Sequence, residues 1–233
     1  MTSVPVNFAL TLIPTALVVF FVSRRFTRSA GDRAALWRSF FFGFLAIIPA
    51  ALLLFAAVLI LRSVGYAAFL TSTTDHSITT VLLRSFLVAG LLEESLKLGA
   101  VYLAAYHRHA LSGLRDGILL TSAAALGFAF FENSFYLTSA VTLVTLRAVA
   151  TVALHASASG IMGYTLAMSK LDQGHVLSGL FIAVFLHGSY NALLVAAPWS
   201  PVFAFLLVAA SVVAVTALYR TAGHKDVMAG RIP

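Results

Sequence analysis

Apolar runs long enough to cross a membrane recur along this 233-residue chain, and they constrain its fold more than any other feature. Runs of about 18 or more such residues are typical of membrane-spanning helices. The composition agrees, since 10% of the residues are charged, whereas soluble domains have about 25%. No polar stretch is long enough to fold as a soluble domain. We therefore predict an all-α, polytopic membrane helical bundle that forms a single transmembrane domain over residues 1–233.

Hydropathy predicts about seven transmembrane helices and their orientation. The expected spans are approximately 5–23, 37–62, 81–106, 115–138, 142–168, 175–196 and 200–219. Eleven of the 15 lysines and arginines fall on one side of this arrangement, and such residues accumulate on the cytoplasmic side of a membrane. We therefore expect the N-terminus outside and the C-terminus in the cytoplasm. The net charge of +7 then reflects topology, and we expect no nucleic acid partner.

The first apolar run is expected to be an uncleaved span. No basic residue precedes it, and Arg24, Arg25 and Arg28 follow it. A cleavable signal peptide has the reverse order.

Ionisable side chains inside the spans mark a candidate site. Such residues are costly within a bilayer and are kept mainly where they have partners and a function. The acidic residues well inside spans are Glu93, Glu94 and Glu132, and the histidines are His155 and His187. They come from four consecutive spans. The chain has no cysteine, which excludes disulfides and a thiol nucleophile. We therefore expect a catalytic core of carboxylates and imidazoles over about 81–196.

Two adjacent glutamates share one lysine in the segment Glu93-Glu94-Ser95-Leu96-Lys97. Lys97 lies one helical turn from both, at the i,i+4 and i,i+3 spacings. It can pair with one glutamate and leave the other for a different role. Two carboxylates in a low-dielectric site resist being ionised together, which suits a general acid or base. The alternative is an ion pair that only packs helices, although such a pair needs no second glutamate.

Three further polar positions follow on the next spans. Glu132 shares a helix face with Phe128, His155 lies among small residues, and Asn191 shares a face with His187. Small residues let helices approach closely, and an asparagine amide can donate to a developing oxyanion. Each position alone could also be a plain hydrogen bond between helices. Together with the paired glutamates, they provide a base and up to three metal ligands.

The residues leave two hydrolytic mechanisms open. In the first, Glu132, His155 and His187 hold a catalytic metal ion, because one carboxylate with two imidazoles is a known zinc set. Zn²⁺ is the metal that such ligands favour among common ions. In the second, no metal takes part, a glutamate acts as the base, and histidine and asparagine donate hydrogen bonds to the oxyanion.

These motifs resemble the PrsW family of intramembrane proteases, which is related to the type II CAAX prenyl endopeptidases. The matching text is Glu93-Glu94-x-x-Lys97, Gly127-Phe128-x-x-x-Glu132-Asn133-x-x-Tyr136, Arg147 with His155 eight residues later, and His187-x-x-x-Asn191. The resemblance covers about 90–195. Glu132 stands where the CAAX branch usually has histidine, which favours the PrsW branch. Asn191 stands where many PrsW-like proteins have aspartate.

The resemblance implies a role for each site residue. Glu93 would activate a water molecule, and Glu94 would pair with Lys97. Glu132, His155 and His187 would position the water or bind a metal. Asn191 would stabilise the tetrahedral oxyanion. The substrates would be membrane-anchored proteins, such as anti-sigma factors, or peptides. We expect the location to be the lipid bilayer of a bacterial plasma (inner) membrane.

Two other functional classes compete with this interpretation. A non-catalytic relative of the CAAX group could act as a membrane scaffold, although the intact glutamate pair argues against it. A proton- or ion-coupled transporter would also need buried carboxylates and histidines. The chain lacks the internal repeat and the paired broken spans that mark many transporters. The sequence makes no prediction of oligomeric state.

Overall fold

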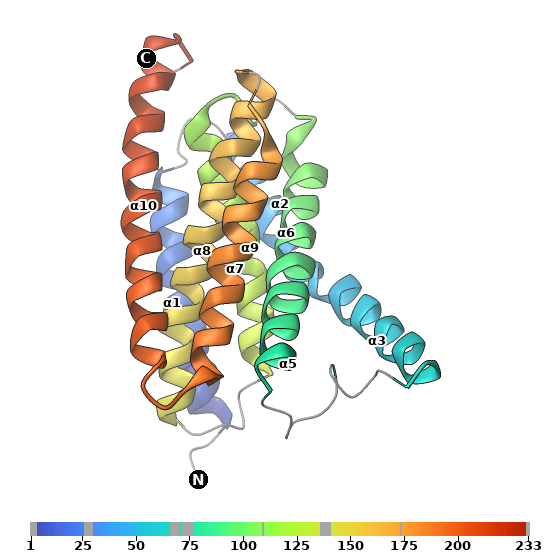
Figure 1. Ribbon diagram of the computed structural model, residues 1–233. Helices are drawn as coiled ribbons and strands as arrows, with labels where there is room; N and C mark the ends of the chain where they lie inside the picture. The colour runs from blue at the N-terminus through green and yellow to red at the C-terminus, as the bar shows by residue number, and fades with distance from the viewer. Residues whose placement is uncertain are drawn as a thin grey trace.

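The computed structural model describes residues 4–25, 30–65, 70, 77–108, 110–135, 141–172 and 174–231. Within these ranges the chain is almost entirely helical and contains no strand, which confirms the predicted all-α fold (Figure 1). The elements are α1 (Val4–Arg25), α2 (Ala30–Leu45), α3 (Ile47–Ser63), α5 (Ile78–Leu83), η1 (Arg84–Leu92), α6 (Glu93–Val101), η2 (Tyr102–Tyr106), α7 (Leu114–Ser134), α8 (Val141–Leu171), α9 (Val176–Ala196) and α10 (Pro201–Met228).

In the described part of the chain, six helical stretches are long and apolar enough to cross a membrane. They are Val6–Arg25, Arg33–Ser63, Leu114–Ser134, Val144–Leu171, Val176–Ala196 and Pro201–Met228. The remaining predicted span, 81–106, corresponds to the continuous run of α5, η1, α6 and η2, in which α and π turns alternate. The chain is thus a multi-pass membrane protein. Its two ends lie at opposite ends of the bundle (Figure 1), and which of them faces the cytoplasm stays a prediction.

The helices α7 and α8 form the centre of the bundle. In their membrane-length windows 83% and 71% of the residues are buried, whereas the other windows reach 11 to 28%. Gly117 of α7 lies so close to Gly163 of α8 that a Cβ atom on either would overlap the carbonyl oxygen of the other. Small residues allow this close approach, which gives membrane helices their van der Waals contact. The polar residues that these two helices carry are therefore drawn into the protein interior.

A second close contact holds α2 against α7. A Cβ atom at Gly43 would overlap the carbonyl group of Ala124, and one at Gly127 would overlap the carbonyl oxygen of Phe40. Gly127 belongs to the motif that contains Glu132, so the glycine of that motif serves helix packing. The motif therefore combines a packing residue with a chemical one on the same helix.

The predicted span 37–62 is not one straight helix. It breaks at Ala46, between α2 and α3, three residues before Pro49. Proline lacks an amide N–H and its ring clashes with the preceding turn, which explains the break. The helix α3 diverges from the bundle (Figure 1), and Ala50 is its buried residue. More than half of the residue surface is exposed at Leu52, Phe55 and Ile60.

The end of α10 is tied to the start of α7 at the basic end of the bundle. The carboxylate of Asp226 accepts hydrogen bonds from the backbone N–H groups of Leu114 (2.9 Å) and Arg115 (3.1 Å). These are first-turn N–H groups that have no partner within their own helix. The helix α10 runs to Met228, beyond the predicted end at 219, because charged residues continue it past the apolar run.

Candidate active site

A π-helical segment positions the paired glutamates. The segment η1 ends at Leu92, and Glu93 and Glu94 open the α-helical segment α6. Segments of π-helix are rare and frequently occur at functional sites. They change the direction in which the following side chains point, because a π turn holds an extra residue. Hydropathy gave no sign of this change within the predicted span.

Glu94 lies at the centre of a closed hydrogen-bond network. Its Oε1 atom accepts from Lys97 Nζ at 2.7 Å and from His187 Nδ1 at 2.8 Å. Its Oε2 atom accepts from Ser159 Oγ at 2.7 Å. Glu94 and Lys97 are completely buried. Both carboxylate oxygens are thus satisfied by three different helices, which locks α6 to α8 and α9.

Lys97 also reaches the first histidine. Its Nζ atom lies 2.6 Å from His155 Nδ1 and 4.5 Å from the centre of the Phe128 ring. An ammonium group can only donate hydrogen bonds, so Nδ1 of His155 accepts. The ring proton is therefore on Nε2, which lies 3.0 Å from Glu132 Oε2 and donates to it. Lys97 and Glu132 together fix both nitrogens of His155.

The second histidine has a nitrogen that faces the open part of the site. Nδ1 of His187 donates to Glu94, so Nε2 carries a free lone pair. This atom lies 3.9 Å from Glu93 Oε2. A carboxylate that holds the far nitrogen of a histidine is the usual way to orient such a ring towards a metal or a substrate. Glu94 thus prepares His187 for a role on its other side.

Glu93 differs from Glu94 in having an unsatisfied oxygen. Its Oε2 atom is buried and has no hydrogen-bond donor among the described residues. Lys97 Nζ lies 3.6 Å from it, which is an ion pair but too long for a strong hydrogen bond. The side chain of Glu93 is 17% exposed and that of Glu132 is 19% exposed. The two glutamates that the closed network leaves out are thus partly exposed, although the Oε2 atom of Glu93 is itself buried.

The donor set suits a metal ion. Glu93, His155 and His187 each offer one ligand atom, and these atoms lie within 4.8 Å of one another. The unsatisfied oxygen of Glu93 and the free nitrogen of His187 both face this space. The predicted set had Glu132 in place of Glu93, and the structure places Glu132 at the Nε2 atom of His155. The donor atoms that lie together are thus those of Glu93, His155 and His187, and Glu132 adjoins this group through its contact with His155.

Asn191 lies at the edge of this group. Its Nδ2 atom donates to the backbone oxygen of His187 at 3.2 Å, one turn earlier on α9. The amide is therefore on the face of α9 that carries the imidazole. The structure joins the other six predicted site residues, from α6, α7, α8 and α9, through side-chain contacts, and Asn191 lies one turn from His187.

Sequence reasoning missed Ser159, which donates to Glu94. Its only signal was a hydroxyl one turn after His155, and serines are common in small-residue helix contacts. Two residues of the matching motifs lie outside the described part of the chain. They are Tyr136 and, for its side chain, Arg147.

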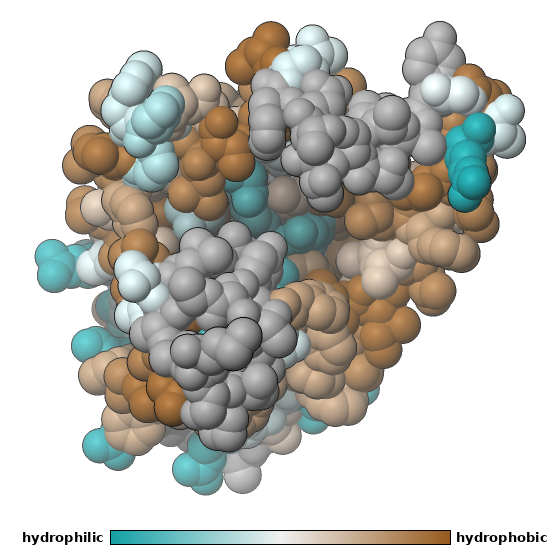
Figure 2. All heavy atoms as spheres, turned by 90° about the horizontal axis from the view of Figure 1, so that it is seen from below, coloured by the Kyte–Doolittle hydropathy of each residue, from teal (hydrophilic) through white to brown (hydrophobic). Residues whose placement is uncertain are grey.

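The end of the bundle at which α7 finishes is hollowed. Figure 2 views this end and shows hydrophilic atoms deep between hydrophobic surfaces. Glu132 is two residues from the end of α7, so the site lies towards this end. By the predicted topology, it is the outer face of the membrane.

Comparison with known proteins agrees with this geometry. The sequence model of the family described as PrsW family intramembrane metalloprotease matches residues 31–218, a range that contains every predicted site residue. Protease PrsW of Halalkalibacterium halodurans is 36% identical over 132 residues, which cover 54% of this chain and 60% of that protein. No solved structure matches the chain.

Two further relatives align over more of their length. Protease PrsW of Shouchella clausii is 27% identical over 195 residues, which cover 81% of this chain and 84% of that protein. Protease PrsW of Bacillus subtilis is 32% identical over 165 residues, which cover 68% and 69% respectively. With the family match spanning most of the chain and the polar cluster inside it, the chain belongs to the PrsW family of intramembrane metalloproteases.

Proposed function

We propose that this protein is an intramembrane endopeptidase that hydrolyses peptide bonds of membrane-anchored proteins or peptides, with Glu93 as the general base. The observation that carries this proposal is the unsatisfied Oε2 atom of Glu93, which faces His187 Nε2 at 3.9 Å. A carboxylate in a membrane bundle is costly unless it has a task. An acceptor held free beside an ordered imidazole can take a proton from an attacking water molecule.

The neighbouring residues hold this base and its partners in place. Glu94 accepts from His187 Nδ1 and from Lys97, so the ring of His187 and the helix α6 keep a fixed relation. The ammonium group of Lys97 forms ion pairs with both glutamates. Asn191 lies one turn from His187 on α9. Its amide would turn from the carbonyl of His187 to an oxyanion on the substrate, a contact that would stabilise the tetrahedral state.

Zn²⁺ is the cofactor we propose, held by His155, His187 and Glu132. The two imidazoles and a carboxylate are a donor set that Zn²⁺ favours. When bound, it would polarise the scissile carbonyl group and lower the barrier to attack by water. To bind the ion through Nε2, His155 would give up the proton that it donates to Glu132, and Nδ1 would take one from Lys97, so that the ligating ring stays neutral. Glu93 lies with both histidines in the group whose donor atoms are within 4.8 Å of one another. The role of each carboxylate is tested by the metal content of variants described in the Discussion.

The substrate we propose is a single-span membrane protein of the anti-sigma-factor kind, cut near the outer face of a bacterial plasma membrane. Two features support this choice. The site lies towards the end of the bundle that the basic residues predict to be outside. The hollow at that end leads water to a hydrophilic interior (Figure 2), which hydrolysis within a bilayer requires.

The test is cleavage of labelled single-span peptides by the purified chain in liposomes. The wild-type protein should cleave, and Glu93→Gln should lower the rate by about a thousandfold, within the usual range for a lost general base. The variant should insert normally and melt at the wild-type temperature, because Gln keeps the shape of the side chain. Full cleavage by a correctly folded Glu93→Gln protein would show that another residue is the base.

A further inference from the structure

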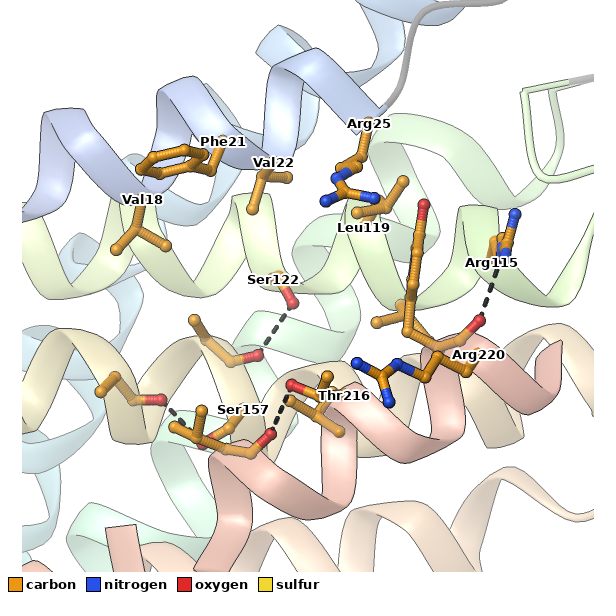
Figure 3. Close-up of a pocket in the computed structure, with 16 residues that line it drawn as sticks. Val18, Phe21, Val22, Arg25, Arg115, Leu119, Ser122, Ser157, Thr216 and Arg220 are labelled. Carbon is orange, nitrogen blue, oxygen red and sulfur yellow. Dashed lines mark hydrogen bonds between the residues drawn. The ribbon is translucent and has the colours of Figure 1, made fainter. Parts of the chain in front are cut away.

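A separate cavity lies between α1, α7, α8 and α10. Its volume is about 540 Å³, and none of the seven residues of the proposed active site lines it. The helices α1 and α10 each pack against α7 and α8 but scarcely touch each other. The cavity is therefore a groove with α7 and α8 as its floor and with α1 and α10 as its two walls (Figure 3).

Three arginines from three helices converge at one end of this groove. They are Arg25 at the end of α1, Arg115 in the first turn of α7 and Arg220 on α10 (Figure 3). Among the described residues that line the groove, none is acidic. The groove end therefore presents concentrated positive charge without a lining carboxylate to neutralise it.

The three guanidinium groups differ in their freedom. Arg115 is fixed by two contacts with Tyr219. Its Nε atom donates to the carbonyl oxygen of Tyr219 at 3.1 Å, and its guanidinium group lies 4.7 Å from the centre of the Tyr219 ring. Arg25 and Arg220 are exposed, and neither forms a hydrogen bond or ion pair with a described residue. One ordered and two available arginines can thus surround a phosphate, which guanidinium groups bind in two-pronged contacts.

The remainder of the groove is apolar. Its walls include Val18, Val22, Leu119 and Val215. Four hydroxyl groups also line it. Three of them donate to a backbone carbonyl of a helix, as Figure 3 shows for Ser122, Ser157 and Thr216, and therefore offer little to a polar ligand. The fourth belongs to Tyr219, whose ring Arg115 contacts. From Arg220 to Val212 the groove extends along α10 by about 12 Å, at the usual rise per residue.

We propose that this groove binds a phospholipid with an anionic headgroup, with the phosphate on the three arginines and an acyl chain in the apolar part. Basic pockets between membrane helices on the cytoplasmic side are typical sites for anionic lipid headgroups. The predicted topology puts the arginines on that side. Because the basic end and the apolar part belong to one continuous groove, we favour a lipid over a free phosphate. A free phosphate would occupy only the basic end.

The experiment measures lipid binding to the purified full chain by native mass spectrometry in detergent. Dioleoylphosphatidylglycerol should bind as a discrete one-to-one complex, whereas dioleoylphosphatidylcholine and glycerol 3-phosphate should bind far more weakly. Arg25→Gln/Arg220→Gln should weaken phosphatidylglycerol binding by about thirtyfold, the factor expected for two juxtamembrane arginines. The matched control is Arg24→Gln/Arg33→Gln, which removes the same charge from exposed positions outside the groove and should leave the affinity unchanged.

A second pair of variants tests the apolar part. Val212→Trp fills the groove from α10 and should displace the acyl chain, whereas Val213→Trp, at the next and more exposed position, should not. Neither position belongs to the proposed active site. Equal binding of the two lipids, equal loss in both arginine pairs, or full binding by Val212→Trp would overturn the proposal. Binding of glycerol 3-phosphate as tight as that of the lipid would assign the arginines to a free phosphate instead.

Discussion

Two adjacent parts of the polar cluster differ in how completely they are closed. Around Glu94 and Lys97 the side chains are fully buried, and every carboxylate oxygen of Glu94 accepts a hydrogen bond. Around Glu93 and Glu132 the side chains are 17% and 19% exposed, and one oxygen of Glu93 is unsatisfied. Neighbouring residues on a helix point about 100° apart. One helical step therefore separates a structural glutamate from one that water can reach.

The difference suggests that the closed part holds the geometry and the open part performs the chemistry. Changes in the open part should then abolish activity and leave stability intact. Changes in the closed part should lower both.

Removal of the metal should abolish cleavage altogether. We expect about one equivalent of zinc per chain, lost in the His155→Ala/His187→Ala double variant, because a zinc site needs three protein ligands. The measurements are elemental analysis of the purified protein and cleavage after treatment with a chelator. Full activity without stoichiometric metal would leave the mechanism in which glutamate alone activates water.

The same measurement separates the two exposed carboxylates. If Glu132 is the third ligand, Glu132→Gln should lose the metal and Glu93→Gln should keep it. The opposite result would exchange the roles of the two glutamates and make Glu132 the base.

Lys97→Met should cause the largest loss of stability. It leaves the carboxylate of Glu94 buried without its cation, a change that costs about 3–5 kcal/mol of unfolding free energy in buried pairs. The measurement is the midpoint of unfolding in detergent. The control is Lys170→Met, a partly buried lysine at the basic end that donates to the carbonyl oxygen of Tyr106. Glu94→Gln in the Lys97→Met background should recover part of the loss, because it removes the unpaired charge. Wild-type stability of Lys97→Met would mean that the closed network contributes little.

Asn191→Ala should lower kcat by about a hundredfold with no change in melting temperature. Loss of one oxyanion donor typically has this effect, and the hydrogen bond seen for its amide only joins one turn of α9 to the next. The measurement compares kcat and KM for one labelled peptide. Asn191→Asp, which keeps the shape but replaces the amide with a carboxyl, should show a similar loss. An unchanged kcat in both variants would exclude the oxyanion role.

Ser159→Ala should have the smallest effect. It removes one hydrogen bond to the carboxylate of Glu94, which is worth about 1.5–3 kcal/mol for a charged acceptor. The matched control is Ser169→Ala on the same helix, whose hydroxyl donates only to the carbonyl oxygen of Leu166. Equal melting temperatures for the two variants would contradict the place given to Ser159 in the network.

The sequence was sufficient for the helices and for the convergence of the polar residues. Charged side chains within apolar spans need one another as partners, so Glu94, Lys97, His155 and His187 could be expected to meet. The sequence was not sufficient to predict the direction in which each side chain points. That depends on the π segment before Glu93, which arises from tertiary packing and leaves no mark in hydropathy.

Two other features lay beyond the pattern of apolar runs. The presence of Pro49 predicted at most a kink within one span. In the structure α3 diverges from the bundle, and little of its surface packs against other helices. The arginines at 25, 115 and 220 were interpreted as determinants of topology alone. Their convergence on one groove depends on how α1, α7 and α10 pack, which their spacing in the sequence does not reveal.

A paired measurement on two variants separates the tasks of the two adjacent glutamates. Cleavage rate and melting temperature are measured together for Glu93→Gln and Glu94→Gln. Glu93→Gln should melt like the wild-type protein and cleave about a thousandfold more slowly, whereas Glu94→Gln should melt at a lower temperature and lose less of its cleavage rate. A stable, inactive Glu94→Gln protein beside an active Glu93→Gln protein would contradict the account.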